Sequence, residues 1–70
     1  MKLMLKQERI KQRWSQDYVA KQIGVTPETI HYIETARRKP SYEVLVKLED
    51  LFHKSHRELF AAADDTSNLS

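Results

Sequence analysis

The stretch SQDYVAKQIGVTPETIHYIE, residues 15–34, decides the fold because start and stop signals divide it into two short helices. Ser15 is a good N-cap, and the next apolar residues recur at helical spacing, which predicts a helix over 16–23. The residues expected to be buried are Val19, Ala20 and Ile23. Gly24, the only glycine in the chain, stands where a helix end favours a left-handed residue, so a tight turn is expected there.

A second helix is predicted over 27–34. Thr26 is an N-cap residue, Pro27 suits the first helical position, and Glu28 lies near the positive end of the helix. Two helices joined this tightly cross at a steep angle, with small residues where their backbones approach. Ala20 and Gly24 are placed for that approach, and the apolar residues Val25, Ile30 and Ile33 are expected to clamp the second helix onto the first. The outer face is then left with Pro27, Glu28, Thr29, His31 and Tyr32.

Three further helices are predicted, one before this unit and two after it. Before it, Leu5, Arg9, Ile10 and Trp14 recur at helical spacing in a first helix that stops at Trp14, which is assigned to the core. After it, Pro40 cannot continue a helix, so residues 35–40 form a basic loop. Ser41 caps a fourth helix with an apolar stripe of Val44, Leu45, Leu48, Leu51 and Phe52, and Ser55 caps a short fifth helix with Leu59 and Phe60 inward. The prediction is an all-α, compact five-helix domain over 1–63 and a disordered tail over 64–70.

Size and composition exclude several classes of protein. The chain has 70 residues and no cysteine, which leaves room for one small core and excludes a disulfide or a zinc–cysteine site. Such a core rarely encloses a substrate pocket, and the serines at caps need no role as nucleophiles, so an enzyme is not expected. His53 and His56 have no third ligand beside them, so neither a metal nor a cofactor is expected. No membrane span or signal peptide is visible, which favours a cytoplasmic protein with no membrane partner.

Charge is divided unevenly between the two halves of the chain. Residues 1–39 hold nine Lys or Arg and four acids, a formal charge of +5, whereas residues 40–70 hold three bases and six acids, a charge of −3. The overall net charge is only +2. This segregation favours a face for polyanions in the first half and a scaffold or partner face in the second.

The sequence resembles the Cro/C1-type, or Xre, helix-turn-helix family, which includes phage repressors and has the lambda-repressor-like fold. The resemblance covers about 60 residues. The matching residues are Arg9, Trp14-Ser15-Gln16, Val19-Ala20, Gly24-Val25-Thr26, Ile30, Ile33-Glu34, Pro40-Ser41 and Leu59-Phe60. The sequence departs from the pattern at Ala36 and at His53-Lys54, where the family usually has glycine and a Gly-Val pair, and at Glu49, where alanine is usual.

The resemblance implies sequence-specific binding of double-stranded DNA, with the second helix of the unit in the major groove. It places Gln16 on a backbone phosphate, Pro27, Glu28, Thr29 and Tyr32 on base edges, and residues 35–39 along the phosphates. It also implies a partly buried ion pair between Arg9 and Glu34. The residues expected at the DNA are Gln16, Thr26, Pro27, Glu28, Thr29, His31, Tyr32, Arg37, Arg38 and Lys39.

Each of these residues also has a simpler interpretation: a helix-start residue for Gln16, the helix dipole for Glu28, and a solvated charge for the loop. The same family analogy suggests a repressor or a DNA-binding antitoxin, and a helical protein-interaction module is the remaining alternative.

One small module covers too little DNA for specificity, so a homodimer is expected on an inverted-repeat operator. The expected dimer surface consists of Phe52, Leu59 and Phe60. Because no effector domain is visible, activity is expected to depend on concentration or on an unidentified protein antagonist.

Overall fold

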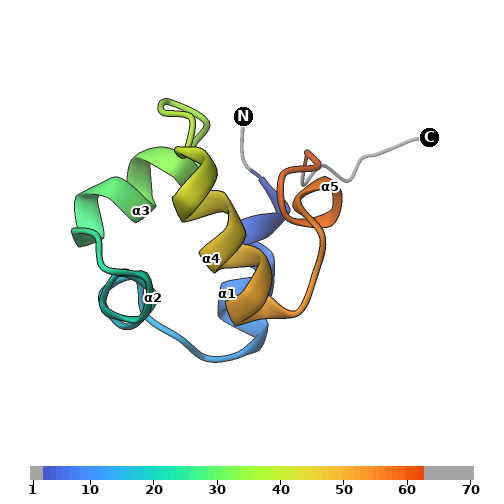
Figure 1. The fold of residues 1–70 in the computed structure, drawn as a ribbon. Coiled ribbons are helices and arrows are strands. Elements are labelled where there is room, and N and C mark those ends of the chain that lie inside the picture. Colours follow the sequence, from blue (N-terminus) through green and yellow to red (C-terminus); the bar gives the residue numbers. More distant parts are fainter. Residues whose placement is uncertain (1–2, 63–70) are drawn as a thin grey trace.

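The computed structural model describes residues 3–62, and within them it contains five helices (Figure 1). Their bounds are α1 Met4–Lys11, α2 Gln16–Ile23, α3 Pro27–Glu34, α4 Tyr42–Phe52 and α5 His56–Leu59. Over these residues the only β-type pairing is an isolated bridge between Leu3 and Ala62. The predicted all-α fold of five helices is therefore confirmed. The predicted tail, 64–70, lies outside the described residues.

The helices surround one small core. In Figure 1, α2 and α3 form one end of the molecule, α4 runs across the middle, and α5 lies at the opposite end near the first residues of α1. The buried apolar residues are Leu3, Leu5, Val19, Ala20, Ile23, Ile30, Ile33, Leu48, Phe52 and Leu59. Every helix thus contributes at least one side chain to the core. No helix within residues 3–62 has the length and apolarity needed to cross a membrane.

The predicted capping residues set the first residue of four helices. In Ser15, Thr26, Ser41 and Ser55 the side-chain hydroxyl accepts the backbone N–H three residues later, at 2.9, 3.2, 3.2 and 3.4 Å respectively. Such a bond satisfies one of the free N–H groups at a helix start. The predicted bounds of α2 and α3 are confirmed for this reason.

Gly24 makes the turn between α2 and α3. Its φ is 78°, and its N–H and that of Val25 both donate to the carbonyl of Ala20, at 2.8 and 2.9 Å. A side chain in this left-handed conformation would cost free energy, which glycine avoids. The turn predicted from the single glycine is confirmed, and it sets the angle at which α3 leaves α2.

The predicted end of the first helix is wrong, because α1 stops at Lys11 rather than at Trp14. Arg13 adopts a left-handed φ of 61°, and the N–H of Trp14 then donates to the carbonyl of Arg9 at 3.1 Å. This closure ends a helix in the way that a glycine usually does. No glycine marks this position in the sequence. Trp14 still packs against the core, with its ring 5.3 Å from that of Phe52.

Two more residues are left-handed, and both stand where the family usually has glycine. Ala36, just beyond α3, has a φ of 61°, and His53, which ends α4, has a φ of 55°. At these two departures from the family pattern, the backbone has the left-handed conformation that glycine favours. Each costs some free energy relative to glycine, because a Cβ crowds the backbone in this region.

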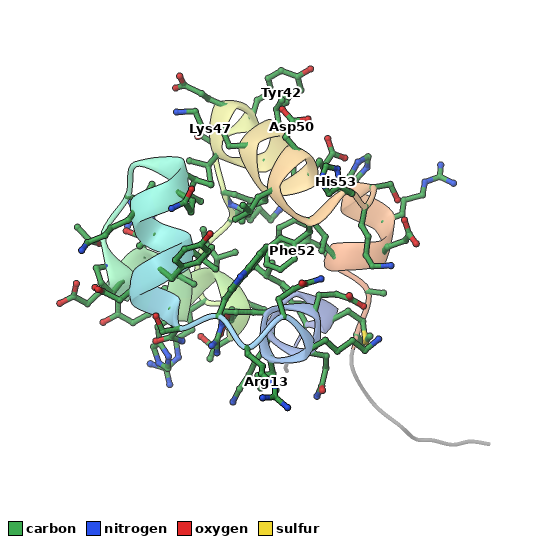
Figure 2. All side chains as sticks on the ribbon, turned by 90° about the horizontal axis from the view of Figure 1, so that it is seen from below. Arg13, Tyr42, Lys47, Asp50, Phe52 and His53 are labelled. Carbon is green, nitrogen blue, oxygen red and sulfur yellow. The ribbon has the colours of Figure 1, made fainter. Side chains whose placement is uncertain are left out.

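The predicted dimer surface is largely inside the molecule. Phe52 is 5% exposed and Leu59 is fully buried, and Figure 2 shows Phe52 pointing into the interior between α1 and α4. The prediction that these two residues face a second copy is therefore wrong, because the fold of a single chain already covers them. Phe60 is half-buried and retains some exposed surface.

A hydrogen-bonded corner joins α4 to α5. One carboxylate oxygen of Glu49 accepts the backbone N–H of His56 at 2.7 Å and lies 3.0 Å from its ring Nδ1. These hydrogen bonds lower the pKa of Glu49 below its usual value. Glu49 thus caps the start of α5 from outside, in addition to the capping box of Ser55 and Glu58.

An ion pair between Arg9 and Glu34 ties α1 to the end of α3. Arg9 Nε lies 2.6 Å from Glu34 Oε2, and Nη2 lies 3.2 Å from Oε1. The two side chains are 11% and 1% exposed, and Arg9 Nη1 also donates to the carbonyl of Trp14 at 2.8 Å. A carboxylate buried to this degree requires a partner, because an uncompensated charge in the interior is strongly destabilising.

Replacing Glu34 by alanine should therefore lower the free energy of unfolding by about 3 kcal/mol, because it strands the guanidinium of Arg9. Replacing both residues by apolar ones, as in Arg9→Met with Glu34→Leu, should recover much of that loss. Urea unfolding followed by circular dichroism measures both changes. A Glu34→Ala variant that unfolds at the parent urea concentration would show that the pair contributes nothing to stability.

Candidate nucleic-acid interface

The outer face of α3 carries polar groups that no other part of the described chain covers. Pro27, Glu28, His31 and Tyr32 are exposed, while Ile30 and Ile33 on the inner face are buried. The exposed pair 27–28 lies four residues before the exposed pair 31–32, which is about one helical turn, so both pairs face the same side of α3. The side chains predicted for base contact, apart from the half-buried Thr29, therefore project from one surface of α3.

This face carries hydrogen-bonding groups of the kinds that distinguish base pairs. The Glu28 carboxylate can accept from the exocyclic amine of cytosine, and the Tyr32 hydroxyl can both donate and accept. Thr26 and Thr29 are less free, because their hydroxyl oxygens lie 2.9 Å apart and that of Thr26 also accepts the N–H of Thr29. Their first role is to cap α3. Among the residues of this face, Glu28 and Tyr32 are the side chains best placed to select a sequence.

The basic loop after α3 has a defined backbone. The N–H groups of Arg37 and Arg38 both donate to the carbonyl of Tyr32, at 2.8 and 3.2 Å. The left-handed Ala36 makes this closure possible. The side chains of Arg37, Arg38 and Lys39 are exposed, so three positive charges start from fixed positions beside the outer face of α3. Cations placed this way suit the phosphates on either side of a groove.

A depression lies between α3, this loop and the start of α4. It is lined by Val25, Thr29, Ile33, Arg38, Lys39, Pro40, Ser41 and Val44. The depression brings residues of α3, the loop and the start of α4 to one edge of the molecule. On α3 it is lined by Thr29 and Ile33 and not by the outer face, so it marks the side of α3 that borders the loop.

Gln16 stands at the first position of α2, half-buried. Its Nε2 donates to Oε1 of Glu34 at 3.1 Å, which leaves its second amide hydrogen free. The start of a helix carries partial positive charge and favours an anion. Gln16 thus combines an amide donor with a favourable helix end, as a phosphate contact needs.

The hydrogen bond between Gln16 and Glu34 is not predicted by the sequence, which indicates a separate role for each residue. Nothing in the sequence marks it, because the residues are 18 positions apart and meet only when α2 and α3 pack. The predicted Arg9–Glu34 pair is present.

Across residues 3–62 no group of three or more His, Cys, Asp or Glu side chains is arranged to hold a metal ion.

Comparison with known protein families agrees with this geometry. A helix-turn-helix family model matches residues 5–59, and the chain belongs to this family, the Cro/C1-type or Xre helix-turn-helix proteins. Its members are DNA-binding domains rather than enzymes, and the chain is a DNA-binding transcription regulator in this general sense. Comparisons with curated proteins and with solved structures gave no match.

Replacing Arg37 and Arg38 together by alanine should weaken binding to every duplex to a similar degree, because phosphate contacts carry no sequence information. The slope of log affinity against log salt should become shallower by about 0.9 for each phosphate that the variant no longer neutralises. Fluorescence anisotropy at several salt concentrations, with specific and unrelated duplexes, measures both effects.

The matched control is Lys47→Ala with Arg57→Ala, which removes the same charge from exposed positions on α4 and α5. This variant should keep the parent slope. If the two double variants change the slope equally, the loop has no special place in binding and only net charge matters.

Proposed function

We propose that the protein is a cytoplasmic repressor that binds an inverted-repeat operator as a homodimer, with α3 in the major groove. The observation that carries this proposal is the exposed polar face of α3, bordered by the three cations of the loop. The helix would read base edges through Glu28 and Tyr32, while the loop and Gln16 would bind phosphates on either side. A repressor needs no more than this, since occupying a promoter is enough to block it.

The homodimer follows from the small size of the domain. A single module of this kind covers roughly 600 to 1,000 Å² on DNA, too little to select one site in a genome. Two copies related by a twofold axis double the number of base pairs read. Of the residues first predicted for the contact between copies, only Phe60 keeps exposed area, and the exposed Ala61 and Ala62 follow it. The proposed surface is therefore the segment that follows α5, residues 60–62.

Selection of duplexes from a random library should return an inverted repeat whose half-sites lie about 10 bp apart between centres, one turn of the double helix. Sedimentation of the protein on that duplex should show two copies bound. Phe60→Asp should bind as a monomer with sharply lower affinity, once circular dichroism has shown that it is folded.

Ile10→Asp is the matched control, because Ile10 is also an apolar residue with much exposed surface, 51%, but lies on α1. It should leave the dimer intact. A parent protein that binds its best duplex as a single copy, or selection that returns no repeated half-site, would contradict the homodimer.

A further inference from the structure

The hydrogen bond between Gln16 and Glu34 connects the surface of the molecule to its interior. Gln16 lies half-buried at the start of α2, and Glu34, the last residue of α3, is 1% exposed. Their Nε2 and Oε1 atoms are 3.1 Å apart. The side chain of Gln16, proposed to bind phosphate, is thus hydrogen-bonded to a buried carboxylate on its inner side.

This contact determines which way the Gln16 amide faces. A carboxylate only accepts hydrogen bonds, so the NH₂ end of the amide must turn toward Glu34. One hydrogen of Nε2 is used in this bond, and the other remains as a donor. A free glutamine side chain would lose rotamer freedom when it bound a phosphate, whereas one already held loses less.

Arg9 makes the arrangement compatible with a phosphate nearby. A lone carboxylate behind Gln16 would repel the anion, but two nitrogens of the Arg9 guanidinium lie 2.6 and 3.2 Å from the oxygens of Glu34. The pair is neutral as a whole. The phosphate therefore meets an oriented N–H donor and no uncompensated negative charge behind it.

We propose that Glu34 is a positioning residue for DNA binding, which holds the Gln16 amide with one N–H directed at a backbone phosphate. The inference rests on the proposed function, because it needs the start of α2 to lie against DNA. Its consequence is that the carboxylate at the end of α3 controls a contact made by α2. Loss of Glu34 should then remove the benefit of Gln16 without affecting phosphate contacts made elsewhere.

A double-mutant cycle tests this coupling. Gln16→Met keeps the length of the side chain and removes the donor, and it should weaken duplex binding about ten-fold, the size of one charge-assisted hydrogen bond. In a Glu34→Gln background the same change should have almost no effect. The carboxamide of that variant has one oxygen where the carboxylate has two. With this oxygen kept on Arg9 Nε–H, as Oε2 is in the parent, an NH₂ group stands beside Gln16, and an NH₂ group cannot accept its hydrogen bond.

Arg37→Ala is the control in both backgrounds. Its loop does not contact Glu34 through any of the hydrogen bonds above, so its cost in affinity should be the same in the parent and in the Glu34→Gln background. A general loosening of the fold would reduce the effects of Gln16→Met and Arg37→Ala alike. Only positioning of Gln16 reduces the first and spares the second.

The apolar pair Arg9→Met with Glu34→Leu provides a second background if Glu34→Gln is not folded, because it removes the carboxylate without stranding a charge. An equal cost of Gln16→Met with and without the carboxylate would overturn the proposal, and so would the absence of any cost in the parent. Either result is compatible with a protein that binds DNA and loses affinity on Arg37→Ala, so it would leave the proposed function intact. A parent protein that fails to bind any duplex would instead overturn the proposed function.

Discussion

The buried carboxylate of Glu34 is the constraint on which the rest of the structure depends. At 1% exposure it must be compensated, and the donors come from Arg9 on α1 and Gln16 on α2, while the carboxylate itself ends α3. These three helices therefore meet at one buried charge. The backbone carbonyl of Glu34 also accepts the N–H of Leu3 at 3.3 Å, which fixes the start of the chain to the same point.

With that arrangement fixed, the helix-turn-helix presents α3 outward as a consequence of packing. Ile30 and Ile33 are buried against α2, so the opposite side of α3 has no neighbour among the described residues and stays polar. The sharp reversals at Gly24 and Ala36 then place the two ends of α3 close to α2 and to the basic loop. A chain this short has little stability to spare, yet within residues 3–62 three of the four left-handed residues are not glycine. The direction of the chain at these points matters more to the fold than the free energy that glycine would recover.

Much of this fold could be predicted from the sequence because its signals are local. Ser15, Thr26, Ser41 and Ser55 each make a cap that depends only on the next three residues, so the starts of four helices follow from the sequence. The end of α1 could not be predicted, because Arg13 adopts a conformation that its residue type disfavours. The apolar spacing predicts that Phe52 and Leu59 face inward, but it does not show how completely the other helices cover them. The contact of Gln16 with Glu34 depends on how two helices pack, and no spacing in the sequence encodes that.

The central claim is that the protein meets DNA with α3, the start of α2 and the basic loop. Titration of the ¹⁵N-labelled protein with its selected duplex, followed by two-dimensional NMR, tests it most directly. We expect the largest amide shifts in residues 16–18 and 27–40, and little change on the outer surface of α4 and in the C-terminal half of α1. Largest shifts on α4 or α1, with α3 unchanged, would contradict it.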